Sequence, residues 1–253
     1  MRARGTNLLA QRVVADGLVM AALLGWWIVS LGVPDFVLPS PWSVLKTLLA
    51  LFVTPSLLGD TVVSTVRVLA AVAASVVIGA VLAFIPYRWP IADAIVHARI
   101  TPFLNSFPAV GWAILVMIWL GTSGLAVTIV EIAVLIPFCL VNISQGLKEL
   151  DQELLEMASS FTRRRRTVLW KIVLPMLLPY ILSATRIAYG VAWKIALVAE
   201  LFGVSSGLGF VMLKAEIVSD AATVYATCFA IVLIFLAGEK LLIDPLSRIV
   251  AYK

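Results

Sequence analysis

Three ionisable residues, Arg67, Glu131 and Lys194, lie inside long apolar stretches of the sequence. A charge inside hydrocarbon is unfavourable, so each of these residues is a candidate for function or for half of an ion pair. If the stretches are helices, all three charges lie roughly 10 Å below the outer ends of their helices, because each residue adds 1.5 Å. Two interpretations follow. Glu131 is neutralised by Lys194 or Arg67, or Lys194 faces a translocation path and leaves a positive potential for an anionic solute.

A polar segment, Asn105-Ser106-Phe107-Pro108, interrupts another apolar stretch. One interpretation is that Asn105 and Ser106 line the same path, together with backbone carbonyls that the proline leaves without a donor. An ordinary proline kink explains the segment equally well.

The composition requires helices that cross a membrane. Hydrophobic residues make up 62% of the 253 residues and charged residues 13%, and the mean hydropathy is +1.07. Crossing a bilayer takes about 20 apolar residues as helix. We therefore predict an all-α membrane protein, a single transmembrane domain over residues 1–253, with six transmembrane helices. The predicted spans are residues 17–33, 62–85, 102–121, 124–144, 175–200 and 222–243.

The basic residues are unevenly distributed between the two sides of these spans. The segments on one side hold most of them, whereas those on the other hold only Lys46 and Lys214. Positive charge marks the cytoplasmic side, so both termini are predicted to be cytoplasmic. The first apolar run has no small-residue cleavage signature and is expected to be a retained span. Anionic membrane lipid, and not nucleic acid, is the expected partner of the net charge of +5.

A long loop, residues 146–172, separates the fourth and fifth spans. A loop of this length is uncommon unless it has structure of its own. Its first half has the 3.6-residue period of an amphipathic helix, with an apolar stripe beside an acidic one. Such a helix either rests on lipid headgroups or docks on a partner. Thr162 can cap a second helix through its hydroxyl. The apolar stripe is Leu150, Leu154, Met157 and Phe161, and the acidic one is Glu149, Glu153, Glu156 and Ser160.

Residues 156–175 resemble the EAA loop of ABC-importer permeases. Five positions match the spacing of that loop: Glu156, Ala158, Ile172, Leu174 and Pro175. Met157 stands where the loop has a second alanine, and Thr162 stands where it has a glycine. The glycine permits a left-handed turn, which a β-branched residue would adopt only at a cost of roughly 1–2 kcal/mol. The bend is therefore expected to be built differently in this chain.

Other positions resemble the nitrate/sulfonate/taurine-type permeases within that group. They are Ser64 and Arg67, Phe107-Pro108 through Trp112 to Trp119-Leu120-Gly121, Arg186, Ala199-Glu200, and residues 206–209. The resemblance implies a type I ABC-importer permease architecture in the inner (cytoplasmic) membrane, with cytoplasmic coupling helices between spans 4 and 5. The implied partners are a second permease copy as a homodimer, two cytoplasmic ATPases, and a periplasmic or lipid-anchored substrate-binding protein.

The resemblance also assigns roles to the loop and to the solute. Met157 and Phe161 would pack in a groove of the ATPase and Glu156 would pair with a basic residue there. The remaining coupling residues are Ala158, Thr162, Ile172, Leu174 and Pro175. The chain has no Gly-x-x-x-x-Gly-Lys-Ser/Thr loop, so ATP and Mg²⁺ belong to the partner ATPase and this chain is expected to bind no cofactor. The expected solute is a small anion such as nitrate, a sulfonate, taurine or an aromatic carboxylate. A thiamine-precursor-like or other heterocyclic solute is the alternative.

Two rival functions are disfavoured by the same sequence. The single histidine, His97, cannot form a two-histidine metal site, and no serine is expected beside it to act as a hydrolase nucleophile. An ion-coupled transporter acting alone would carry acidic ion sites in broken helices, and Glu131 is the only acidic residue predicted well inside a span. We therefore expect a transport subunit and not an enzyme.

Overall fold

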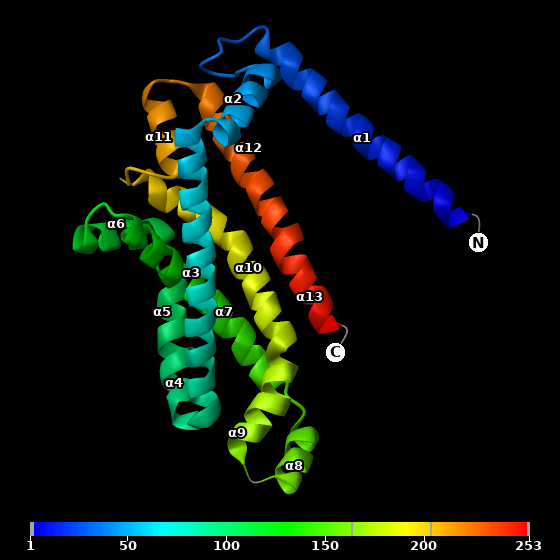
Figure 1. Ribbon diagram of the computed structural model, residues 1–253, viewed down its shortest axis with the longest axis vertical. Helices are drawn as coiled ribbons and strands as arrows, with labels where there is room; N and C mark the ends of the chain where they lie inside the picture. The colour runs from blue at the N-terminus through cyan, green and yellow to red at the C-terminus, as the bar shows by residue number, and fades with distance from the viewer. Residues whose placement is uncertain (1–2, 163, 203, 252–253) are drawn as a thin grey trace. The chain divides into compact units, whose positions relative to one another are not determined.

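The computed structural model describes residues 3–162, 164–202 and 204–251, and every regular element in these ranges is a helix (Figure 1). Five helices are long and apolar enough to cross a membrane, and a sixth span is present if one bent helix pair is counted. The chain divides into two compact units, residues 1–58 with 211–230, and residues 59–210 with 231–253.

The long apolar helices overlap five of the six predicted spans. They are α1 (Ala3–Ser30), α3 (Pro55–Arg88), α7 (Gly124–Lys148), α10 (Leu174–Leu201) and α12 (Ala221–Gly238). The short elements include η1 (Pro90–Ala92), α4 (Asp93–Ile95), α8 (Gln152–Phe161), α9 (Arg165–Val168), α11 (Leu208–Ile217) and α13 (Asp244–Ala251).

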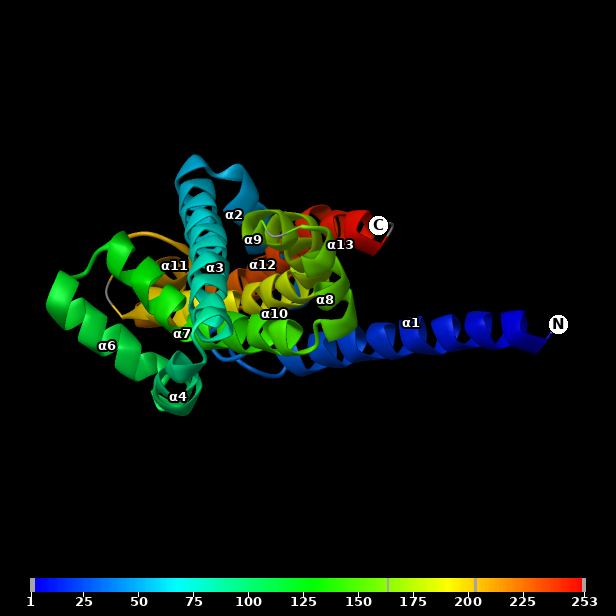
Figure 2. The same cartoon turned by 90° about the horizontal axis from the view of Figure 1, so that it is seen from below.

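The predicted third span, residues 102–121, is broken in two. Helices α5 (Thr101–Ser106) and α6 (Ala109–Leu120) meet at 89°. Phe107 is extended, with φ −81° and ψ 123°, as the residue before a proline prefers. The Phe107 ring packs against Trp112, with centroids 4.9 Å apart. Figure 2 shows α6 leading away from α4. The break is far sharper than the proline kink that was one of the two expectations.

The first unit packs α1 and α2 (Pro41–Val53) with residues 211–230. Ser40 caps α2 by accepting a hydrogen bond from the Ser43 amide at 3.2 Å, and Pro41 occupies the first turn, where its missing N–H is not needed. The Trp26 ring contacts Tyr225 and Phe229, each with a centroid distance of 6.1 Å. The buried core of this unit is Val44, Leu51, Val211, Ala226 and Ala230.

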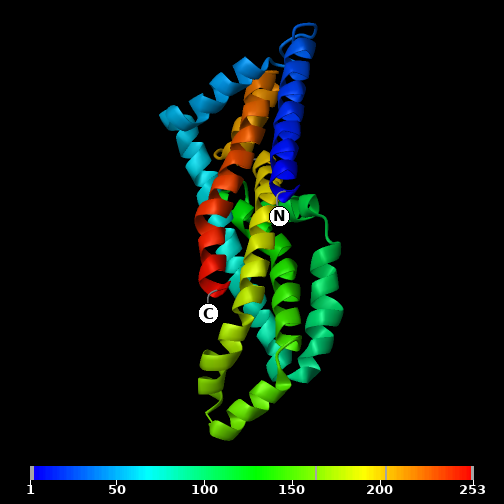
Figure 3. The ribbon, with the colours of Figure 1, turned by 90° about the vertical axis from the view of Figure 1, so that its right-hand side faces the viewer.

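The second unit is built on α3, α7 and α10, and α10 packs most extensively against α7 (Figure 3). Small residues let helix backbones approach closely within a membrane, where the hydrophobic effect does not drive helix association. Gly79 of α3 illustrates this, because a Cβ atom there would lie 2.6 Å from Cβ of Cys139 on α7. The buried side of α10 carries a row of alanines at positions 184, 188, 192, 196 and 199.

Three π-helical segments precede prolines that would otherwise break a helix. They are η2 (Val96–Ile100), η3 (Leu169–Val173) and η4 (Glu239–Ile243), which lie just before Pro102, Pro175 and Pro245. In each case the residue before the proline donates its N–H to the carbonyl five residues back. A proline ring clashes with the carbonyl four residues back, and the wider π turn relieves that clash. Residues 165–201 therefore run as one continuous helical stretch despite Pro175.

Candidate functional site

The loop between α7 and α10 forms two short helices, α8 and α9. Asp151 caps α8, because its Oδ1 accepts hydrogen bonds from the amides of Glu153 at 2.9 Å and Leu154 at 3.2 Å. Amides in the first turn of a helix lack partners within the helix, and an aspartate at this position satisfies them. Asp151 was not among the predicted residues, although an aspartate before an amphipathic run is a recognisable start signal.

Helix α8 presents an apolar stripe to the outside of the chain. Ala158 is 5% exposed and lies on the buried side of the helix. By contrast, Met157 is 54% exposed and Phe161 84%, and Leu154 beside them is exposed as well. Leu150, at the start of the predicted stripe, is buried. Large apolar side chains that are exposed side by side mark a site where another apolar surface binds.

Among the residues of the bend between α8 and α9 that the structure describes, none is left-handed. Thr162 is extended, with φ −150° and ψ 130°, and its hydroxyl accepts a hydrogen bond from the Arg164 amide at 3.3 Å. An extended backbone suits a β-branched residue, which explains why threonine can replace glycine here. Beyond the bend, Ile172 and Leu174 are half-buried and Pro175 is exposed in the first turn of α10.

Glu149 fixes the start of this loop to α10. The Tyr180 hydroxyl donates to one carboxylate oxygen at 2.5 Å, and Gln145 Nε2 donates to the other at 2.9 Å. These two hydrogen bonds, chiefly that from Tyr180, lower the pKa of Glu149 because they favour its ionised form. Gly146 leaves the space that the Tyr180 ring occupies.

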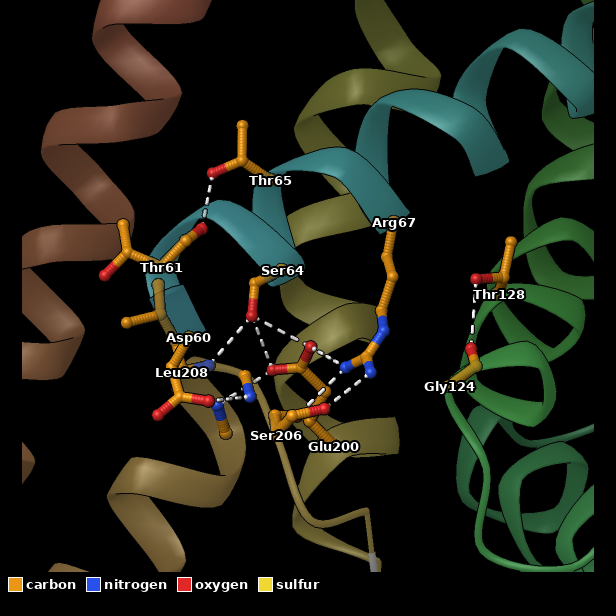
Figure 4. A network of polar contacts seen from close by, with 12 residues as sticks. Asp60, Thr61, Ser64, Thr65, Arg67, Gly124, Thr128, Glu200, Ser206 and Leu208 are labelled. Atoms are coloured by element: carbon orange, nitrogen blue, oxygen red, sulfur yellow. Dashed lines mark hydrogen bonds and ion pairs between the residues drawn. The ribbon is translucent and has the colours of Figure 1, made fainter. Parts of the chain in front are cut away.

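Arg67 and Glu200 form a buried ion pair at the far end of α10 from this loop. Nη1 of Arg67 lies 2.9 Å from Oε1 of Glu200 and also donates to the Ser206 carbonyl at 2.9 Å. Nη2 donates to the Ser206 hydroxyl at 2.8 Å (Figure 4). Glu200 is 1% exposed, so its carboxylate depends on hydrogen-bond donors of the protein and not on water.

Further hydrogen bonds attach residues 206–209 to α3 and α10. The Ser64 hydroxyl lies 2.8 Å from both Glu200 oxygens and accepts a hydrogen bond from the Leu208 amide at 2.8 Å. The Gly209 amide donates to Glu200 at 2.9 Å, and the Gly207 amide donates to Asp60 at 2.8 Å. Gly207 has φ +111°, and a side chain there would overlap the Glu200 carboxylate. The resemblance pointed to most of these residues individually but did not predict that they form one hydrogen-bonded network.

The interpretation that Glu131 is paired with Lys194 or Arg67 is wrong for the conformation that the structure describes. Glu131 is fully buried, and neither of its oxygens has a hydrogen-bond partner in the described part of the chain. Arg67 is held by Glu200 instead, and Lys194 is exposed. The residue number predicts how deep a charge lies along its helix. It does not predict which neighbouring helix the charge faces, because that depends on packing.

Lys194 belongs to an exposed face of α10. Ser183, Ile187, Gly190 and Lys194 follow the i, i+4, i+7, i+11 spacing of one helix face, and all but the half-buried Gly190 are exposed. Lys194 forms no ion pair with any described residue.

Other polar residues of the spans have partners or lie at the broken helix. Arg186 pairs with Glu239 at 3.3 Å and with Asp244. Asn105 and Ser106 are exposed at the end of α5, where Ser106 donates to the Pro102 carbonyl at 2.7 Å.

His97 has a serine neighbour that sequence reasoning did not find. Nε2 of His97 lies 3.0 Å from the Ser144 hydroxyl, and Nδ1 lies 2.9 Å from Oδ1 of Asp93. The expectation that no serine lies beside this histidine is wrong, because the turn through η2 brings it against α7. Ser144 is only 5% exposed. These groups line a cavity of about 210 Å³ together with Tyr87 and Lys148.

Comparison with known proteins decides between a transporter subunit and an enzyme. Residues 75–242 match the family of binding-protein-dependent transport system inner membrane components. The chain belongs to this family. It is therefore a transport subunit of the inner membrane and not an enzyme, and the system's ATPase and binding protein are separate components.

Named relatives cover most of the chain. The taurine transport system permease protein of Escherichia coli is 29% identical over 81% of this chain and 77% of its own length. A Bacillus subtilis protein assigned as an aliphatic sulfonates transport permease is 28% identical over 83% and 76%. A Brucella melitensis protein assigned as an ABC transporter permease is 26% identical over 89% and 91%.

The network around Glu200 predicts unequal effects of two adjacent substitutions on α3. Ser64→Ala removes the hydroxyl that contacts Glu200 and the Leu208 amide, so we expect it to lower the free energy of unfolding by about 1–3 kcal/mol. Thr65→Ala is the control, because among the described residues the Thr65 hydroxyl bonds only to the Thr61 carbonyl of its own helix. Thermal unfolding of both variants in one detergent measures the difference, and equal midpoints would contradict this account of the network.

The contact between Glu149 and Tyr180 predicts a pH dependence. The folded-state pKa of Glu149 is lowered, so its contribution to stability is present above the unfolded pKa and is lost as pH falls through the folded pKa. Tyr180→Phe should raise this pKa and lower the unfolding midpoint at neutral pH, with the difference from the parent protein shrinking in acid. Unfolding midpoints between neutral and acid pH test this. A difference that grows in acid would show that the hydrogen bond to Glu149 is not its source.

Proposed function

We propose that the chain is the permease subunit of an ATP-driven importer and forms the translocation path for a small anion of the taurine, sulfonate, nitrate or aromatic carboxylate class. The observation that carries the anionic substrate is Lys194, an exposed cation on a membrane-spanning helix with no ion pair among the described residues. The relatives named for taurine and aliphatic sulfonates support the same class.

The exposed face of α10 supports a path and not a surface in contact with lipid. A lysine against hydrocarbon costs about 2.5–3.5 kcal/mol at the centre of a span on insertion scales, and Lys194, about two turns inside the end of α10, would bear part of that cost. The face with Ser183, Gly190 and Lys194 is therefore expected to be covered by water or by a second copy of the chain. We infer a homodimer in which the two α10 faces border one path. Arg186 is already neutralised by two carboxylates, so Lys194 supplies the net positive charge.

The exposed stripe of α8 supports coupling to the ATPase. We place α8 and both termini on the cytoplasmic side, as the distribution of basic residues predicts. Leu154, Met157 and Phe161 would then insert into a groove of the ATPase, and each large apolar side chain contributes roughly 1.5–3 kcal/mol when fully buried. The Glu156 carboxylate and the small Ala158 belong to the same helix, with Glu156 at its exposed side.

The continuous helical stretch from residue 165 to 201 supports transmission of movement. Ile172, Leu174 and Pro175 join α9 to α10 through η3 without a loop. If the loop moves when the ATPases close, this continuous helix would move as a rigid body and displace the face that carries Lys194. Alternating access would follow from rotation of these helices. Asn105, Ser106, Arg67 and Glu131 are the remaining candidates for the path or its gates.

The anion path predicts that the charge of Lys194 matters for uptake. In liposomes that contain permease, ATPase and binding protein, Lys194→Met should lower ATP-dependent uptake of labelled taurine or an alkanesulfonate about tenfold or more, since charge-assisted contacts contribute about 1.5–3 kcal/mol. Lys194→Arg should keep most of the uptake. Lys240→Met, which removes an exposed lysine elsewhere, is the matched control. Unchanged uptake by an intact Lys194→Met complex would refute the role of Lys194.

A further inference from the structure

Glu131 is a buried acceptor without a donor. Both of its oxygens are shielded from solvent and lack a hydrogen-bond partner among the described residues. A buried acceptor without a donor destabilises a membrane-spanning bundle, and packing contacts alone do not offset this cost. A leucine or methionine would fill the same volume without that cost. The carboxyl group is therefore best explained by an interaction that forms in another conformation.

Arg67 is the donor best placed to supply that interaction. Its guanidinium packs against the beginning of α7, where Nη2 lies 2.6 Å from the position that a Cβ atom of Gly124 would take. Gly124, Thr128 and Glu131 share one face of α7 at the spacing i, i+4, i+7. Figure 4 shows Arg67 beside this face, and the Thr128 hydroxyl donates to the Gly124 carbonyl at 3.1 Å instead of turning to the arginine.

Helix geometry indicates how far Glu131 lies from the Arg67 guanidinium, which packs against Gly124. The two α7 positions, 124 and 131, are roughly 10 Å apart along the helix axis at 1.5 Å per residue. Helical side chains point toward the N-terminus of their helix, so Glu131 covers the turn that precedes it and lies closer to Arg67 than its own Cα does.

We propose that Arg67 exchanges Glu200 for Glu131 during the transport cycle. In the conformation described, Arg67 binds Glu200 and Ser206 and holds residues 206–209 against α3. When these residues separate from α3, the guanidinium loses those acceptors together. Moving along α7 past Gly124, which has no side chain to obstruct it, the guanidinium then binds the Glu131 carboxylate.

This exchange keeps the cation paired in both conformations. Without a second acceptor, release of residues 206–209 would leave a charge unpaired between apolar helices, and the conformational change would be slow. Glu131 therefore acts as a positioning residue for Arg67. The proposal rests on the conformational cycle of the family and is independent of the anionic solute proposed above.

The test uses the permease assembled with its ATPase and binding protein in lipid nanodiscs, with ATP turnover as the readout. Glu131→Gln is isosteric and removes no hydrogen bond seen in this conformation, so it should leave the thermal unfolding midpoint unchanged or raise it. It should nevertheless lower ATP turnover about tenfold, the effect of one lost charge-assisted hydrogen bond. Glu200→Gln is the matched control, because it should lower the midpoint.

Two further variants separate charge from volume and identify the partner. Glu131→Asp keeps the carboxylate but changes the size, and it should retain more turnover than Glu131→Gln. In an Arg67→Gln background, Glu131→Gln should have little additional effect, since the two residues act as one unit.

Three results would overturn the proposal. The first is a Glu131→Gln variant with unchanged turnover. The second is a thermal unfolding midpoint of Glu131→Gln as low as that of Glu200→Gln. The third is lower turnover for Glu131→Asp than for Glu131→Gln, an order that remains decisive if Arg67→Gln does not assemble.

Discussion

The ion pair between Arg67 and Glu200 sets the conditions that its surroundings must meet. A buried pair is tolerable only if its remaining hydrogen-bonding groups are satisfied. Ser64, Ser206 and the amide of Gly209 meet that requirement here, and glycine is needed at 207 because a side chain would collide with the carboxylate. One charge pair thus dictates small or polar residues on two helices and on the segment that follows α10.

The same helix joins this network to the loop that carries α8. Glu200 lies at the last turn of α10, Lys194 lies less than two turns earlier, and α9 enters the first turn through η3. Because α10 packs closely on α7, we expect a displacement of the loop to be passed along α10. One helical stretch therefore leads from the loop that carries α8 to the exposed Lys194 and on to the buried ion pair at Glu200.

Hydropathy and local spacing predicted much of this arrangement. Of the six spans predicted from the apolar runs, five overlap long helices, because helix length and side-chain polarity are local properties. The amphipathic period of residues 150–161 correctly indicated a helix, and Met157 and Phe161 are indeed exposed together. The sharp break at Phe107 was only half foreseen, since a proline predicts interruption but not the angle. Contacts between distant residues were not predictable, as with Glu131, and with His97 and Ser144, which are brought together by helix packing.

Hydrogen exchange of the permease with and without its ATPase tests the central claim most directly. If α8 is the surface that the ATPase grips, amides of residues 152–161 should exchange more slowly in the assembled complex than in the permease alone. Phe161→Ser should reduce both this protection and the amount of ATPase retained. An assembled complex in which α8 exchanges at the same rate, while other segments become protected, would contradict the account.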